Sequence, residues 1–174
     1  MATWSTSAST SDGKGTDTCA EKRQAPRQTD REESVDQQLL DAYLSAEYWV
    51  EEVPVPFALR VGFGSEALRA LHVECGVSCS AFLTAYNPGS RPHSDAWNRA
   101  AQDRMEADLI CEGFALRRGV GQDPLGVWPG EPSVLALGIP RDRAEVIGRR
   151  YGQNAVVWSD AGGIPELLEL FRTD

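Results

Sequence analysis

The sequence predicts an α/β fold: one compact domain in which helices pack on a mixed β-sheet of about five strands, preceded by a disordered tail. Two observations predict this class. Segments with helical periodicity alternate with short apolar segments, which is typical of parallel crossovers. Two strand segments, 114–119 and 133–139, follow one another without a helix between them, which indicates one antiparallel hairpin.

The first 34 residues differ in composition from the rest. Eleven of them are Ser or Thr, and few are apolar. Such a segment cannot bury enough surface to offset a backbone ordering cost of about 1–2 kcal/mol per residue. We therefore expect a disordered tail over 1–34 and a single domain over 35–174.

Apolar residues at three- and four-residue spacing, bounded by capping signals, predict five helices. Ser34 and Gln37 form a capping box, and Ser65 and Ser94 are suited to cap the second and third helices. Gly163 together with Pro165 indicates the start of a short last helix. The predicted helices cover about 35–46, 65–76, 94–113, 140–151 and the segment from 163 onward.

Strands are predicted where apolar residues alternate or run continuously between turn signals. The segment 57–63 alternates with a period of two, and 79–86 is mostly apolar, as in a central strand covered on both faces. The remaining predicted strands are 114–119, 133–139 and 154–158. Two polar loops, 87–92 and 121–132, follow strands and are rich in proline and glycine.

The charge balance excludes some classes of partner. The chain has 17 basic and 26 acidic residues, a formal charge of −9 and a pI near 4.7. Nucleic-acid binding proteins normally carry a basic surplus, so we expect no nucleic-acid partner. No apolar run approaches the roughly 20 residues that span a bilayer, and residues 1–11 lack the pattern of a secretory signal. We expect a soluble cytoplasmic protein without a membrane partner, and no feature indicates an oligomeric state.

Two short motifs have competing interpretations. The segment Gly62 to Ala67 reads G-x-G-x-x-A between a strand and a helix, as in dinucleotide-binding folds. No acidic residue follows the next strand to bind a ribose, so an ordinary strand-to-helix turn is favoured. His72, Cys75 and Cys79 have a spacing that suggests zinc, but no second ligand pair follows, and we expect no metal site. No motif specifies a cofactor.

Polar residues concentrate at three predicted strand ends, and these residues form our candidate site. The loop 87–98 enters a helix N-terminus, where α/β proteins often bind ligands. Its alternative role is structural, because Ser94 and Asp95 would cap the helix and Asn87 would hold the turn. In the long loop, Asp123, Glu131 and Trp128 could supply acid–base chemistry, or they could stabilise the loop. Gln153 and Asn154 are either ligand-reading amides or part of a helix end.

The polar motifs also resemble those of one protein family. They are Ala42-Tyr-Leu-Ser45, Ala81 to Pro88 with Ser90-Arg91 and Ser94-Asp95, Asp123-Pro, Trp128, Glu131-Pro-Ser133 and Gly152-Gln-Asn-Ala155. Together they resemble the bacterial domain-of-unknown-function family numbered 3293, over about residues 40–170. The resemblance implies a small single-domain protein with polar signature residues at strand ends, and it implies no activity. By resemblance, a site would include Asn87, Ser90, Asp95, Asn98, Asp123, Glu131, Gln153 and Asn154.

Our first hypothesis is a domain that binds or acts on a small polar or anionic metabolite in a pocket at the strand ends. The candidate acids or bases are Asp95, Asp123 and Glu131. The candidate ligand-binding residues are Arg60, Asn87, Ser90, Arg91, Asn98, Trp128, Gln153 and Asn154, in which Arg60 and Arg91 would meet an anionic group. The alternatives are a non-enzymatic protein-interaction module and, less favoured, nucleotide binding at Gly62–Ala67.

Overall fold

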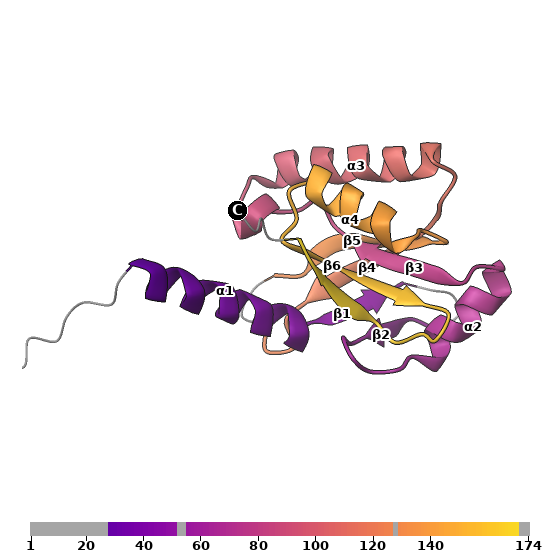
Figure 1. The fold of residues 1–174 in the computed structure, drawn as a ribbon. Helices are drawn as coiled ribbons and strands as arrows, with labels where there is room; N and C mark the ends of the chain where they lie inside the picture. The colour runs from indigo at the N-terminus through magenta and orange to yellow at the C-terminus, as the bar shows by residue number, and fades with distance from the viewer. Residues whose placement is uncertain (1–27, 52–54, 127–128, 171–174) are drawn as a thin grey trace, which may run out of the picture.

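The protein folds around one seven-stranded antiparallel sheet with helices on both faces (Figure 1). The computed structural model describes residues 28–51, 55–126 and 129–170. The helices are α1 (Gln28–Ser45), α2 (Glu66–Cys75), α3 (Asp95–Cys111) and α4 (Arg141–Arg150), with a 3-10 turn at Pro88–Ser90. The strands are β1 (Glu47–Val50), β2 (Phe57–Leu59), β3 (Cys79–Leu83), β4 (Ala115–Gln122), β5 (Glu131–Leu137), β6 (Ala155–Asp160) and β7 (Glu166–Glu169). None of the helices in these ranges is both long and apolar enough to cross a membrane.

The centre of the fold is a βαββαβ unit. The chain runs β3-α3-β4-β5-α4-β6, and the four strands are ordered β4-β5-β3-β6 in the sheet. Each helix therefore connects two parallel strands that are separated by one antiparallel strand, which is the ferredoxin-like split βαβ arrangement. Strands β1 and β2 extend this sheet on one edge, and β7 extends it on the other.

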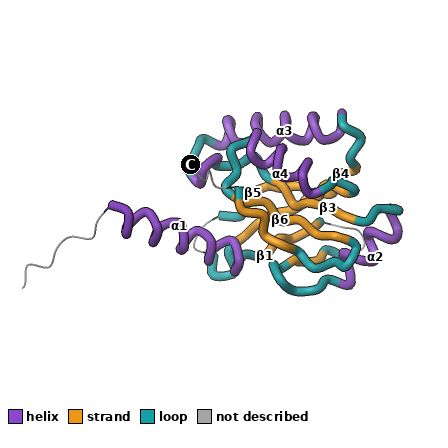
Figure 2. The backbone as a smooth tube through the Cα atoms, in the orientation of Figure 1, coloured by secondary structure: helices purple, strands orange, loops and turns teal. Residues whose placement is uncertain are grey.

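The two faces of the sheet bury separate cores because neighbouring side chains on a strand point in opposite directions. Ala81 and Leu83 of β3 lie in the core under α3 and α4, with Met105 and Ile147 from those helices. Phe82 lies in the opposite core, which α2 covers. The tube view shows α3 and α4 on the same side of the sheet and α2 on the other (Figure 2).

Local sequence signals set two of the helix starts as predicted. The Ser65 hydroxyl accepts a hydrogen bond from the Leu68 N–H at 3.2 Å, and the Ser94 hydroxyl accepts one from the Trp97 N–H at 3.3 Å. Gly76 ends α2 with a φ of 66°, a left-handed conformation that favours glycine.

Several expectations about the fold are wrong. The sheet is not mixed, because every pair of neighbouring strands is antiparallel, and it has seven strands instead of about five. The C-terminal segment forms β7 instead of a helix: Leu168 and Leu170 enter the core under α3 and α4, and Leu167 packs against the opposite core. Residues 28–34, expected in the tail, belong to α1; the expectation for 1–27 lies outside the described residues.

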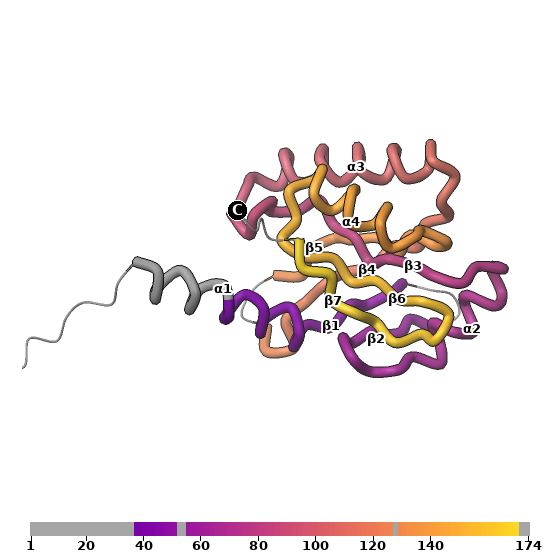
Figure 3. The backbone as a smooth tube through the Cα atoms, viewed as in Figure 1, coloured from indigo at the N-terminus to yellow at the C-terminus, as the bar shows by residue number. Residues whose placement is uncertain are grey.

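The sheet curls so that its first edge approaches the β6–β7 turn. The N–H of Gly62 donates to the Pro165 carbonyl, and the N–H of Ser65 donates to the Gly163 carbonyl, both at 2.8 Å. These bonds connect the loop after β2 to the turn between β6 and β7; Figure 3 shows the course of the backbone through both segments. The bonds thereby hold the two edges of the sheet, at β2 and β7, close to each other.

Candidate functional site

Many of the predicted polar residues lie at one end of the strands, along the side of the sheet where β3 ends and β5 begins. In the sheet, Glu47 pairs with Gln122, Gly121 pairs with Glu131, and Leu83 pairs with Val134. In an antiparallel sheet, an edge of this kind alternates strand starts and strand ends. The loop after β3, the start of β5 and the segment before β6 therefore meet although the sheet is not parallel.

Asn87 connects the first two of these segments to α3. Its side-chain N–H donates to Glu131 Oε1 at 2.7 Å, and its side-chain oxygen accepts from the Asn98 amide at 2.9 Å and from the His93 N–H at 3.0 Å. Asn98 is buried, and its own oxygen accepts from the Asn87 backbone N–H at 3.0 Å. Both polar atoms of the Asn87 side chain are thus hydrogen-bonded: the nitrogen to Glu131, and the oxygen to Asn98 and His93.

Ser90 connects the same loop to α1 and to the segment before β6. Its hydroxyl lies 3.2 Å from the Tyr43 hydroxyl and accepts a hydrogen bond from the Asn154 amide at 2.9 Å. Next to Asn154, the Gln153 amide donates to the Tyr86 carbonyl at 3.0 Å. We call Tyr43, Asn87, Ser90, Glu131 and Asn154 the strand-edge cluster.

The backbone of the loop that carries the cluster is strained. Asn87 has a φ of 45° and Ser90 a φ of 56°, and they are the only non-glycine residues with positive φ in the described part of the chain. Left-handed backbone of this kind costs serine about 1–2 kcal/mol, and such strain is often found at functional sites. The loop is held in place by a hydrogen bond from the Gly89 N–H to the Gly152 carbonyl at 2.7 Å.

Glu131 is the electrostatically unusual member of the cluster. Burial raises the pKa of its carboxyl group, and the hydrogen bond from Asn87 opposes that rise only in part. Burial also raises the pKa of Tyr43, against hydrogen bonds from Ser90 and Asn154, and the nearby charge of Glu131 adds to the rise. Within the described residues, no arginine or histidine forms an ion pair with Glu131.

The other predicted acids and bases lie apart from this network. Arg60 is ion-paired with Glu47 at the β1–β2 corner, where it holds the pKa of that carboxyl below its usual range. Arg91 and Asp95 are exposed at the loop and at the first turn of α3. Asp123 accepts a hydrogen bond from the Leu125 N–H at 3.0 Å, as in a turn. The predicted role of Trp128 lies outside the described residues.

The Gly62–Ala67 turn is poorly suited to bind a nucleotide. It follows a three-residue strand at the sheet edge instead of a central parallel strand. Two of its backbone N–H groups are already bonded to the segment Gly163–Pro165. A pyrophosphate needs such groups unpaired, so the ordinary strand-to-helix turn agrees better with the geometry.

Tyr43 is a member of the cluster that sequence reasoning missed. It lies in the motif Ala42-Tyr-Leu-Ser45, which contributes to the family resemblance, but it reads as one apolar position of an amphipathic helix. The Tyr48 hydroxyl donates to its backbone carbonyl at 2.8 Å and so anchors the end of α1 to β1. That anchor directs the Tyr43 hydroxyl toward Ser90.

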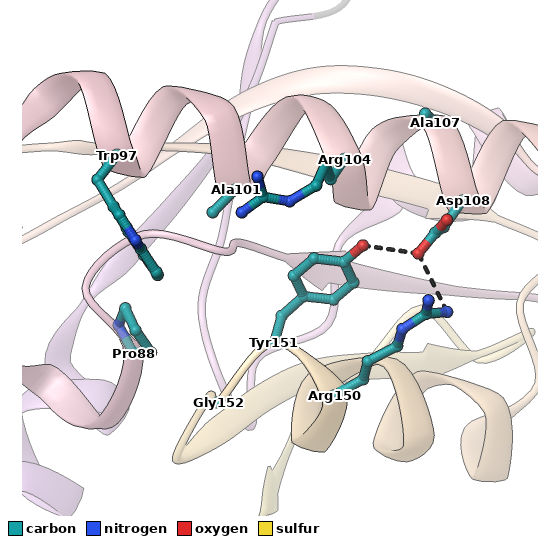
Figure 4. A pocket seen from close by; sticks show the side chains of 9 residues that line it. All are labelled: Pro88, Trp97, Ala101, Arg104, Ala107, Asp108, Arg150, Tyr151 and Gly152. Carbon is teal, nitrogen blue, oxygen red and sulfur yellow. Dashed lines mark hydrogen bonds and ion pairs between the residues drawn. The ribbon is translucent and has the colours of Figure 1, made fainter.

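A groove of about 550 Å³ lies between α3 and α4 and adjoins the loop of the cluster (Figure 4). Trp97, Arg104 and Asp108 line it from α3, and Arg150 and Tyr151 line it from the end of α4. Pro88 and Gly152, at one end of the groove, also flank the residues of the strand-edge cluster. The two sites thus share one stretch of backbone.

The matched family covers both the cluster and the groove. Residues 83–156 match the model of a family described as "Protein of unknown function (DUF3293)". Comparisons of the chain with curated proteins and with solved structures gave no match. All residues that line the groove lie within the matched segment, as do all members of the cluster except Tyr43. The matched family is thus the one that the polar motifs of the sequence resemble.

Proposed function

We propose that this domain binds a small polar molecule at the strand-edge cluster, and that Glu131 accepts an N–H or ammonium group of that molecule. The observation that supports the proposal is the state of Glu131. Its side chain is partly buried, and its carboxyl group receives one hydrogen bond, from Asn87, with no cation paired to it in the described chain. A partly buried charge without a counter-ion is unfavourable for folding, and ligand binding is a common reason for its presence.

The neighbours of Glu131 suit a polar ligand better than an apolar one. The hydroxyls of Tyr43 and Ser90 can each donate or accept, and the Asn154 amide supplies a further donor. Groups of this kind fix the orientation of a ligand that carries several polar atoms. The five residues of the cluster include one carboxylate and no basic side chain, so the cluster favours a cationic or neutral polar ligand over an anion.

Burial raises the pKa of Glu131, and a rise is the direction of shift that favours a carboxyl group as a general acid or base near neutral pH. Any ligand that binds here should therefore also be incubated with the protein and tested for chemical change over time. A bound ligand that stays unchanged assigns the domain a binding role alone.

A thermal-shift screen of the full chain against amines, amino acids, amides and sugars tests the proposal. A ligand present at about 100 times its Kd stabilises the folded protein by about 2.7 kcal/mol. We expect Glu131→Gln to abolish this stabilisation, because glutamine keeps the acceptor for Asn87 but loses the charge. Glu74→Gln, an equal change of charge on the exposed surface of α2, should leave it unaltered. A screen without any stabilising compound, or equal stabilisation of the Glu131→Gln variant, would reject the proposal.

A further inference from the structure

The groove between α3 and α4 combines an aromatic wall with small side chains. Trp97 exposes 41% of its surface, a large fraction for a tryptophan that lines a concave site. Its ring stacks against His93, with centroids 4.3 Å apart and planes inclined by 22°, and so has a fixed orientation. Ala101 and Ala107 leave space along the α3 side. In Figure 4 the indole of Trp97 extends toward Pro88 at one end of the groove.

The other end of the groove carries more positive than negative charge. Arg150 pairs with Asp108 at 3.1 Å, and Asp108 also accepts a hydrogen bond from the Tyr151 hydroxyl at 2.6 Å. Arg104 lines the same groove and forms no ion pair with any described carboxylate. Two guanidinium groups therefore face one carboxylate, in a chain whose net charge is −9. A local positive excess on an acidic protein indicates a place for an anion.

Asp108 contacts Tyr151 and Arg150, and Arg104 is the arginine of the groove that remains available for an anion. Burial and the hydrogen bond to Asp108 raise the pKa of Tyr151 to about 12, so its hydroxyl stays protonated and donates to Asp108. Asp108 Oδ2 thus accepts a hydrogen bond from Tyr151 and forms an ion pair with Arg150, and no ion pair joins Asp108 to Arg104. The Arg104 guanidinium, with its planar fork of donors, is suited to bind a carboxylate or phosphate through two parallel hydrogen bonds.

We propose that the groove between α3 and α4 binds a small molecule that pairs one planar ring with one anionic group, the ring against Trp97 and Pro88 and the anion against Arg104. The volume agrees with this class, because ligand pockets usually measure about 300–1,000 Å³. The anion is a carboxylate or a phosphate, both of which a guanidinium recognises in the same way. This site does not depend on the function proposed for the strand-edge cluster, since its charge and its residues are different.

NMR titration of the full chain with phenyl phosphate and benzoate tests the site. The indole N–H signal of Trp97, assigned by its loss in Trp97→Phe, reports on the ring end of the groove. We expect at least one of the two probes to shift this signal with a Kd of about 1 mM, typical of a probe of this size. Which probe binds more tightly distinguishes a phosphate ligand from a carboxylate ligand.

Two further probes separate the ring from the charge. Inorganic phosphate has the charge without a ring, and benzyl alcohol has the ring without a charge. We expect each to bind at least about tenfold more weakly than the better aromatic anion, because each makes one of the two contacts. Equal binding by either of them would contradict a site that recognises both groups.

Variants on the same helix connect the binding to Arg104. Arg104→Ala should weaken the aromatic anion by about tenfold or more, because one charged hydrogen-bond partner is lost. Arg99→Ala removes the same charge from an exposed position of α3 that does not line the groove, and it should leave the Kd unchanged. No shift of the Trp97 signal at millimolar probe, or an equal Kd in the wild type and Arg104→Ala, would overturn the proposal. Neither result would bear on Glu131 and the strand-edge cluster.

Discussion

Gly152 is the residue at which the loop of the candidate site depends most directly on the backbone of α4. It has a φ of 69°, and a Cβ atom at this position would lie 2.8 Å from the Pro88 Cβ. In Gly152→Ala, the left-handed conformation costs alanine about 1 kcal/mol. Moving Pro88 away would also weaken the bond between Gly89 and Gly152, which is worth about 1 kcal/mol. With residual overpacking, we expect a total loss of about 2–4 kcal/mol in the free energy of unfolding.

Gly76→Ala is a matched control for this substitution. Gly76 also follows a helix and has a φ of 66°, but no atom lies within 4 Å of its added Cβ. Its variant should lose only the conformational part, about 1 kcal/mol. Urea unfolding followed by circular dichroism measures both variants, and NMR shifts of Ser90 report on the loop. Equal losses in the two variants would refute the claim that contact with Pro88 positions the loop.

Three further predictions concern buried groups. The carboxyl of Glu131 has a raised pKa in the folded state, so stability is lost as pH rises through that pKa. Glu131→Gln should therefore stabilise the protein at pH 7 by about 0.5–1 kcal/mol, measured by urea unfolding. A destabilised variant would contradict the argument that burial raises this pKa. Burial lowers the pKa of His72, so the stability of the protein should fall as pH decreases below about 6.5, the range in which the unfolded state gains a proton. Urea unfolding midpoints at pH 7.5 and 5.5 measure this fall. The fall should be larger in the wild type than in His72→Gln. Gly119→Ala should lower the free energy of unfolding by at least about 2–3 kcal/mol, because its Cβ would lie 2.4 Å from the Trp49 carbonyl oxygen and 2.6 Å from the Phe82 ring. A thermal unfolding temperature equal to that of the wild type would show that β1 shifts without cost and would contradict this prediction.

The elements with strong local signals were predictable from the sequence. The helix after Ser94 has a capping hydroxyl and a long apolar stripe, and the strand at 79–83 is a continuous apolar run. Strand β1 was missed because its four residues follow α1 after the single residue Ala46, so no turn separates the two patterns. Strand β7 was mistaken for a helix because four residues are too few to distinguish the two periods.

The direction of the strands could not be read from the order of elements. The crossovers from β3 to β4 and from β5 to β6 do connect parallel strands, as the alternation of helix and strand indicates. Each crossover, however, leaves a gap that an antiparallel strand from elsewhere in the chain fills. A sequence contains no local record of which strand enters such a gap, so a split arrangement and a mixed sheet give the same pattern.

The candidate site was predictable where polar residues stand beside strand ends. Asn87, Glu131 and Asn154 follow or precede buried strands, and the structure brings them into one network. Arg60 joins no such network because Glu47, in the strand that was missed, pairs with it. The groove was not predicted, because its residues are spread over two helices without a motif, and only the placement of both helices on one face of the sheet brings them together.

The segment Pro88–Ser90 has a consequence for how the two proposed sites behave together. Pro88 lines the groove, and two residues later Ser90 contacts Tyr43 and Asn154. If a ligand on one side favoured one position of this segment, it would change the affinity for a ligand on the other side. Linkage makes the effect reciprocal: the factor by which the first ligand alters the second equals the factor by which the second alters the first. The two sites together would then form one cooperative unit, in which a short strained turn is the coupling element.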